Sequence, residues 1–225
     1  MFFPAIRPVL FSKFCNITIN FVNLVVMAND ELQKLKLDLH TKDLEIKELK
    51  KLVTKDALTG LFNRRGFEEE VSRLVKDVLY SKQNLYKRKR FYIDSISLLF
   101  LDLDDFKKVN DGFGHKVGDQ ILQQAAQIIK KKIRNIDFCG RWGGEELIVA
   151  LIGSREENAF RKAEEIRKAI RSRVKINNNP VTVSIGVAEL STGSNFEELI
   201  SRADKAMYEA KHRGKNNAVR YSELS

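Results

Sequence analysis

Residues 96–106 read ISLLFLDLDDF, a nearly uninterrupted apolar run that passes directly into aspartates. Such a run is typical of a central strand whose two faces are both covered. Asp102 lies where the strand should end, with Asp104 and Asp105 just beyond it. We therefore expect the middle strand of a sheet, and we expect it to bring a carboxylate to one edge of that sheet.

The segments on either side of this strand follow helical and strand periods in turn. We expect helices over 65–80, 115–133, 155–174 and 195–214, a hairpin of strands 138–142 and 146–152, and further strands over 181–190 and 217–221. In chain order the pattern is helix, strand, helix, hairpin, helix, strand, helix, strand. This order predicts an α/β domain in which helices cover a mixed central sheet.

The expected hairpin carries GGEE at its tip, residues 143–146. Two adjacent carboxylates beside an apolar strand are costly to place without a cation. If the hairpin lies beside the central strand, one of the glutamates meets Asp102. Such a pairing suits Mg²⁺, which takes one or two protein carboxylates together with substrate phosphates. The glycines would let the backbone approach a bulky ligand, although a plain polar turn explains them equally well.

Polar and basic residues near these acids are candidates for nucleotide contacts. Asn110 and Asp119 offer an amide and a carboxylate, which together can read the donors and the acceptor of guanine. A turn residue and a first-turn helix carboxylate are the plainer interpretations of the two. Lys107, Lys211 and Lys215 are candidate phosphate contacts, although cations also favour a helix C-terminus, where Lys211 and Lys215 lie.

Residues 30–53 show a different pattern, an apolar heptad seam surrounded by charge. Six of the seven a and d positions from Leu32 to Val53 are apolar. This pattern predicts a coiled-coil helix that forms a parallel dimer, with a single amphipathic helix as the alternative. Residues 54–225 would then form the globular domain.

Residues 1–29 contain an uncharged stretch, from Phe14 to Asn29, that asparagines interrupt. It is shorter than a membrane span requires, and it has no small-residue cleavage site typical of a signal peptide. We expect a disordered segment, or sequence upstream of a start at Met27, rather than a membrane anchor.

Composition sets only broad limits on the function. Hydrophobic residues make up 43% and charged residues 31%, and the net charge is +10, values typical of a globular protein with anionic partners. The basic cluster Lys82–Arg90 could contact nucleic acid, but a solvated loop is the preferred interpretation. The two cysteines, Cys15 and Cys139, lack metal-ligand spacing and indicate reduced thiols in a cytoplasmic protein.

Five motifs, taken together, have the order and spacing of one family. They are DALTGLFNRRGF, LDLDDFKKVNDGFGHKVGD, RWGGEEL, VTVSIGVA and ADKAMYEAKHRGKN. From Asp56 to Tyr221 the sequence closely resembles the GGDEF-domain diguanylate cyclases. The resemblance implies a domain related to the palm fold of nucleotidyl cyclases and polymerases. It also implies condensation of two GTP into cyclic di-GMP with release of pyrophosphate, using Mg²⁺ or Mn²⁺, in a dimer that brings two active sites together.

The resemblance also implies roles for particular positions. Asp102 and Glu145 look like metal ligands, assisted by the Leu103 carbonyl, and Glu145 would help to deprotonate the attacking ribose hydroxyl. Glu146 is similar to the second acid of the signature, near the metal or the substrate. The substrate contacts implied are guanine readers at Asn110 and Asp119, phosphate contacts at Lys107, Lys211 and Lys215, and close approach to the nucleotide at Gly143 and Gly144.

A second family feature is the sequence RNID, which contains Arg134 and Asp137, with five residues between Asp137 and Gly143. It resembles the inhibitory product-binding site of the family. Arginine can bind phosphate or guanine in a fork, and aspartate can accept from the guanine edge. The alternative is a local ion pair at a helix end, which contributes little. Arg161 and Arg167 are candidates for the arginine that would complete such a site.

The sequence departs from the family pattern in two places. Leu147 stands where the signature has phenylalanine, an apolar strand position at which leucine should cost little. The connection over residues 79–95 is longer than usual and basic. The competing functional hypothesis is a non-catalytic receptor for cyclic di-GMP or GTP, but retention of the signature acids argues against it. A nucleic-acid binder would leave those acids unexplained, so no nucleic-acid partner is expected.

Overall fold

The computed structural model describes residues 27, 29–46, 49, 53–83, 93, 95–191 and 193–224, and of residues 81–83 it describes the backbone only. The chain divides into two compact units, Met1–Lys51 and Leu52–Ser225. Most of the expected N-terminal segment and the side chains of the basic cluster Lys82–Arg90 lie outside the described residues.

The first unit contains a helix over residues 29–46. Its large apolar side chains are exposed, including the heptad residues Leu32, Leu35 and Leu39. A row of exposed apolar side chains is what a coiled coil buries against its partner. The helix is thus observed where it was expected, and dimerisation through residues 30–53 stays a prediction. Within the described part of the chain, no helix combines the length and the apolar character needed to cross a bilayer.

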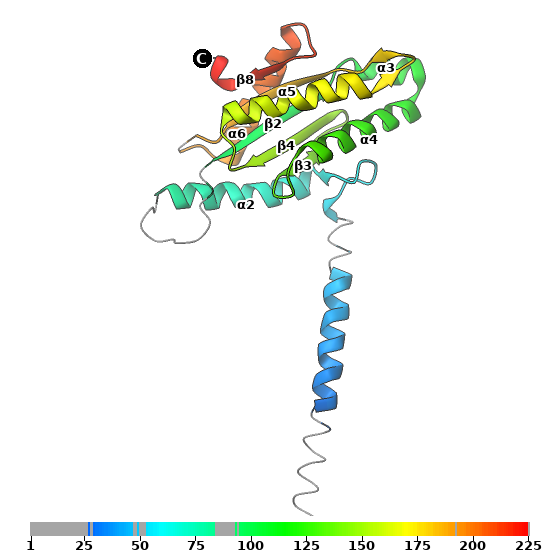
Figure 1. The fold of residues 1–225 in the computed structure, drawn as a ribbon. Helices are drawn as coiled ribbons and strands as arrows, with labels where there is room; N and C mark the ends of the chain where they lie inside the picture. Colours follow the sequence, from blue (N-terminus) through cyan, green and yellow to red (C-terminus); the bar gives the residue numbers. More distant parts are fainter. Residues whose placement is uncertain are drawn as a thin grey trace, which may run out of the picture. The chain divides into compact units, whose positions relative to one another are not determined.

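The second unit is built on a six-stranded mixed sheet in the order β1-β3-β4-β2-β7-β8 (Figure 1). The strands are β1 (Phe62–Asn63), β2 (Ile96–Leu103), β3 (Phe138–Arg141), β4 (Glu146–Ile152), β7 (Val183–Glu189) and β8 (Ala218–Arg220). β2 pairs antiparallel with both β4 and β7, whereas β1 with β3 and β7 with β8 are parallel. All eight residues of β2 are buried, which confirms the central strand predicted from its apolar run.

Helices cover both faces of this sheet (Figure 1). They are α2 (Arg64–Gln83), α4 (His115–Lys132), α5 (Glu156–Arg173) and α6 (Phe196–His212). β2 feeds two cores because successive side chains point to opposite faces. Leu99 and Leu101 pack in the core that includes residues of α4 and α5, and Leu98 and Phe100 pack in the one that includes residues of α2 and α6. The predicted mixed sheet flanked by helices is confirmed.

Local signals in the sequence explain several element ends. Asn63 caps α2, because its side-chain oxygen accepts a hydrogen bond from the Gly66 amide at 2.8 Å. Gly214 follows α6 with φ 101°, a left-handed conformation that glycine adopts without strain. Leu147 is fully buried in β4, consistent with the apolar strand position expected for it.

Among the described residues, the α-helix α3 (Phe106–Phe113) and the short 3-10 helix η1 (Tyr221–Glu223) were not expected. α3 is short, and it contains Asn110 and Gly112, which are poor helix formers. It begins after Asp105, whose φ of 57° turns the chain sharply at the end of β2. Asn110 therefore lies on a helix, and the interpretation of it as a turn residue was wrong.

Candidate active site

The sheet brings acidic residues together at the end of β2. Asp102 lies directly opposite Glu146 of β4 and Ser184 of β7. Beside this pair, the Leu103 amide donates to the Glu145 carbonyl at 3.4 Å. The expected convergence of Asp102 with the GGEE hairpin is therefore present.

These carboxylates lie in surroundings that oppose their ionisation. Asp102 is only 5% exposed, and burial raises its pKa although the Lys211 ammonium lies 2.8 Å from its Oδ2. Burial, followed by the charge on Asp102, also raises the pKa of Glu145 and of Glu146. Negative groups that raise one another's pKa favour a cation between them.

The donor set at this point fits Mg²⁺ or Mn²⁺. Among the described residues, no group of three or more His, Cys, Asp or Glu side chains is arranged to hold a metal ion by itself. Mg²⁺ is commonly held by one or two carboxylates and completed by water and substrate phosphates. Asp102 and Glu145, with the nearby Leu103 carbonyl, could provide such a partial set of hard oxygen ligands.

At the hairpin tip, Gly143 lies against the Glu146 side chain. A Cβ built on it would overlap the Glu146 carboxylate, whereas a Cβ on Gly144 would meet nothing within 4 Å. Neither glycine is among the described residues with a left-handed φ. The Glu146 side chain therefore folds against Gly143 in this arrangement, and a left-handed backbone is not the reason for either glycine.

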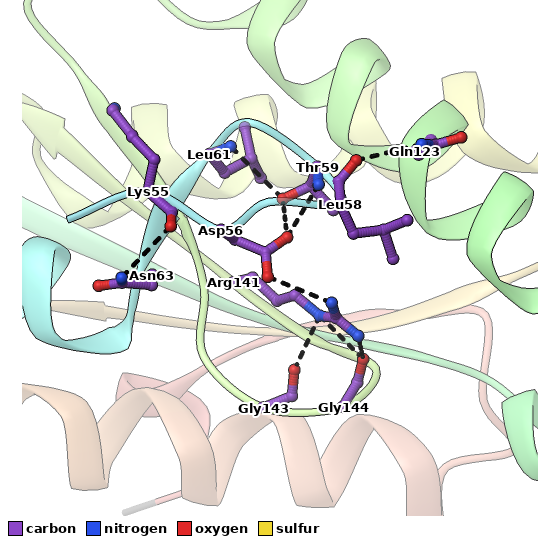
Figure 2. A network of polar contacts seen from close by, with 10 residues as sticks. All are labelled: Lys55, Asp56, Leu58, Thr59, Leu61, Asn63, Gln123, Arg141, Gly143 and Gly144. Carbon is purple, nitrogen blue, oxygen red and sulfur yellow. Dashed lines mark hydrogen bonds and ion pairs between the residues drawn. The ribbon is translucent and has the colours of Figure 1, made fainter. Parts of the chain in front are cut away.

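Arg141 binds the backbone of the hairpin tip, and Figure 2 shows its guanidinium between Asp56 and the two glycines. Its guanidinium donates to the Gly143 carbonyl at 3.1 Å and to the Gly144 carbonyl at 2.8 Å. Its Nη1 lies 3.2 Å from Asp56 Oδ2. Burial acts to raise the pKa of Asp56, but hydrogen bonds from Thr59 and the charge of Arg141 outweigh it and hold that pKa below its usual value. The tip is thereby fixed to the loop that precedes α2.

Asp104 fixes the other side of the site. Its carboxylate accepts hydrogen bonds from Thr182 Oγ1 at 2.7 Å, from Ser184 Oγ at 2.6 Å and from the Asn216 amide at 2.9 Å. These bonds join β2, β7 and the loop after α6, although the three segments are distant in sequence. Asp104 is therefore a structural carboxylate with a full set of donors.

The candidate nucleotide contacts lie on elements next to this edge. The Asn110 side chain of α3 lies against Gly118 of α4, where a Cβ would overlap its Oδ1, and exposed Asp119 follows Gly118 in the chain. Lys107 is exposed, and Lys215 pairs with Asp105 at 2.9 Å. The structure thus places Asn110 close to the helix turn that carries Asp119, and it leaves Lys107 available to a ligand.

Arg134 and Asp137 lie in the turn between α4 and β3 and bind each other. The Asp137 carboxylate is 2% exposed and accepts from Arg134 N, Nε and Nη2 and from the Ile152 amide. The Arg134 side chain is 57% exposed. Of the candidates for a completing arginine, Arg161 pairs with Glu157, and Arg167 binds Glu164 and Asn216.

Sequence reasoning missed the supporting residues Asp56 and Arg141, and it mentioned Asp104 without giving it a role. Arg141 directly precedes the WGGEE motif, so its position was a usable signal. The partners of Asp104 lie 78 to 112 residues away in the chain, and no local pattern reveals such contacts.

Comparison with known proteins places this geometry in a family. The sequence model described as "Diguanylate cyclase, GGDEF domain" matches residues 53–217. Diguanylate cyclase A of Treponema denticola is 36% identical over 179 residues, which cover 76% of this chain and 45% of that protein. The response regulator PleD of Caulobacter vibrioides is 37% identical over 177 residues, which cover 75% of this chain and 36% of that protein. The chain therefore spans less than half the length of these curated relatives.

Solved structures have the same fold. The coiled coil and GGDEF domain of DgcB from Caulobacter crescentus, in complex with c-di-GMP, superposes with a TM-score of 0.73 at 27% identity, covering 85% of this chain and 98% of that one. The active GGEEF domain of a diguanylate cyclase from Vibrio cholerae superposes with a TM-score of 0.62 at 32% identity, covering 71% of this chain and 96% of that one.

Proposed function

Because the chain belongs to the GGDEF-domain family of diguanylate cyclases, we propose that it condenses two GTP into cyclic di-GMP and releases pyrophosphate. The observation that carries the proposal is the acidic edge of β2, where Asp102, Glu145 and Glu146 each have a raised pKa. Carboxylates whose pKa is raised by burial and by one another's charge suit a divalent cation, and that cation suits the phosphates of a nucleotide.

In this proposal Asp102 and Glu145 hold Mg²⁺ or Mn²⁺, with help from the Leu103 carbonyl. The ion would neutralise charge on the triphosphate and lower the pKa of the attacking 3′-hydroxyl. Glu145, beside the metal, would help to accept the proton of that hydroxyl. Glu146, folded over Gly143, would act beside the metal or the substrate.

The remaining assignments concern the nucleotide. Asn110 and Asp119 would read the guanine edge, since amide and carboxylate together match its donors and acceptor. Lys107 and Lys215 would contact phosphates, and Gly144 has open space beside it for the nucleotide. Lys211 is bonded to Asp102 in the ligand-free protein, and it would turn to a phosphate when a cation takes its place.

The proposed enzyme acts as a dimer, because one GTP site cannot form both phosphodiester bonds without a second facing it. The exposed apolar residues of the helix over 29–46 supply a surface for parallel pairing. A cytoplasmic location would give the sites access to GTP. The variant Leu35→Pro/Leu49→Pro is expected to be monomeric and inactive, and a dimeric, fully active variant would contradict this role.

Product inhibition is proposed to depend mainly on Arg134. Its guanidinium is exposed, whereas the Asp137 carboxylate already accepts bonds from Arg134 and from the Ile152 amide. Asp137 would therefore orient Arg134 toward the phosphates of cyclic di-GMP. Arg134→Ala should relieve the slowing caused by added product, and unchanged inhibition would refute the assignment.

Incubation with GTP and Mg²⁺ tests the activity directly. The purified full chain should release cyclic di-GMP and pyrophosphate in a 1:2 ratio, as two condensations require. Glu145→Ala, matched with the exposed control Glu157→Ala, should lose the activity while the control keeps it. Absence of product at high protein concentration would refute the proposed function.

A further inference from the structure

A second concave site lies away from the acidic edge of β2. A cavity of about 470 Å³ opens beside α5 and the short hairpin of β5 (Lys175–Ile176) and β6 (Asn179–Pro180). Its lining residues are Arg167, Lys168, Arg171, Ser172, Lys175, Asn178 and Pro180. Four of these seven carry a positive charge and none is acidic. Neither Arg134 nor Asp137 lines the cavity, and of the two candidates for a completing arginine only Arg167 does.

The walls of this basic cavity are held in place by local structure. Asn177 and Asn178, with φ of 48° and 68°, form the two-residue turn that suits a tight hairpin. The Val181 amide bonds the Val174 carbonyl at 2.9 Å, which closes the base of the hairpin. Ser172 lies between the basic residues on the last turn of α5. Local hydrogen bonding and turn geometry therefore fix the hairpin backbone on one side of the cavity.

The positive charge of the cavity is only partly balanced. Glu164 pairs with Arg167 at 2.7 Å and with Lys168 at 3.8 Å. For Arg171 and Lys175, no ion pair is recorded with any residue that the structure describes. Cations at the end of α5 also complement the helix dipole, and Lys175 follows that end at the start of β5. Arg171 and Lys175, whose positive charges no described ion pair balances, therefore both line this cavity.

We propose that this basic cavity is a binding site for a compact polyphosphate, an anion with at least two linked phosphoryl groups. Its volume lies in the range of small-molecule sites. Basic side chains and the amide of Asn178 are donors of the kind that phosphate oxygens accept from, whereas the Ser172 hydroxyl already donates to the Ala169 carbonyl at 3.1 Å. None of the lining residues is aromatic, so nothing there offers a platform on which nucleic-acid bases could stack. The phosphates themselves are therefore what the site recognises.

A line of hydrogen bonds joins this cavity to the loop after α6. Arg167 Nη1 donates to Asn216 Oδ1 at 2.8 Å and to the Asn216 carbonyl at 3.1 Å. The Asn216 amide donates in turn to Asp104 Oδ2 at 2.9 Å. A polyphosphate that holds Arg167 should therefore also hold Asn216. This inference does not rest on the proposed function, since its test measures binding and amide exchange rather than turnover.

Calorimetric titration of the full chain with inorganic tripolyphosphate tests the site. We expect Arg171→Glu/Lys175→Glu to weaken binding at least tenfold. The charge-matched control Lys76→Glu/Lys205→Glu, on exposed positions of α2 and α6, should bind as the wild type does. Lys211→Ala should also retain this binding, which separates the cavity from the acidic edge of β2. Titrations with pyrophosphate and with ATP distinguish a free polyphosphate from a nucleotide-borne one.

Hydrogen exchange gives a second readout that does not depend on any variant's folding. Tripolyphosphate should slow exchange of the Asn216 amide in the wild type. Equal binding by Arg171→Glu/Lys175→Glu and the wild type would overturn the proposal. Tighter binding of a single-stranded oligonucleotide than of tripolyphosphate, lost in the same variant, would also overturn it in favour of nucleic acid. Unchanged exchange at Asn216 would refute the connection to the loop.

Discussion

Asp102 and Asp104 stand two residues apart at the end of β2, both buried, at 5% and 7% exposure. Their surroundings differ. Asp104 accepts hydrogen bonds from two hydroxyls and one backbone amide. Asp102 has one lysine and faces two glutamates whose pKa its own charge raises. Asp104 is thus satisfied by three donors of the fold, whereas Asp102 has Lys211 alone and lies in the proposed metal site.

The same contrast divides the other acids of the domain. Asp56 and Asp137 are each held by an arginine and by backbone amides, so they belong with Asp104. Glu145 and Glu146 belong with Asp102. Satisfied carboxylates should govern stability, whereas crowded ones should govern metal binding and activity.

The largest expected effect is the loss of activity when Asp102 is changed. Asp102→Asn removes a charge from the proposed metal site, and we expect cyclic di-GMP formation to fall about 1,000-fold or more, because a bound metal contributes several kcal/mol to such a transition state. Unfolding should change little. The measurement pairs a GTP turnover assay with urea denaturation. A variant that keeps its turnover but loses stability would reverse the comparison.

The next effect is on stability at the satisfied group. Asp104→Asn places an amide among donors that need an acceptor, and we expect the free energy of unfolding to fall by about 3 kcal/mol. Asp105→Asn, at the adjacent and more exposed position, should cost less than about 1 kcal/mol. Urea denaturation of the two variants checks the difference, and equal losses would show that Asp104 is not a structural anchor.

A smaller effect on turnover is expected at Arg141, which joins Asp56 to the hairpin tip that carries Glu145 and Glu146. Arg141→Met keeps the apolar stem but removes the bonds to Gly143 and Gly144, so the hairpin tip should loosen. We expect turnover to fall about tenfold, about 1.4 kcal/mol in the barrier. Arg73→Met, which removes an exposed pair with Glu70, is the control. Turnover equal to that of the control would mean that Arg141 does not position the tip.

The smallest expected effects concern the pH dependence of stability, which has opposite signs for Asp56 and Glu146. The pKa of Asp56 is lowered in the folded protein, so its contribution to stability is present above about pH 4 and is lost as pH falls further. The pKa of Glu146 is raised, so stability is lost as pH rises above about 4. In chelator, Asp56→Asn should lower the free energy of unfolding relative to the wild type, and this loss should shrink as the pH falls. Glu146→Gln should raise the free energy of unfolding, and this gain should grow toward neutral pH. Parallel pH profiles for the two variants would contradict the assignment.

The sequence predicted those features that a local pattern records. The apolar run of β2, the helical period of α2 and the GGEE tip were all predicted correctly, because each depends on neighbours in the chain. α3 was missed because Asn110 and Gly112 weaken its helical signal and Asp105 turns the chain just before it. The donors to Asp104 come from segments distant in sequence, so no spacing could distinguish this aspartate from Asp102.

The most direct test is thermal unfolding of the wild type and Glu145→Gln at neutral pH. Each protein is measured in chelator and in Mn²⁺ with a non-hydrolysable GTP analogue, with Glu157→Gln as the control. In chelator we predict that Glu145→Gln is at least as stable as the wild type, because it relieves repulsion with Asp102. With metal and nucleotide, the wild type and the control should gain several degrees, and Glu145→Gln should gain little. A variant that is less stable in chelator and gains as much as the wild type would contradict the account.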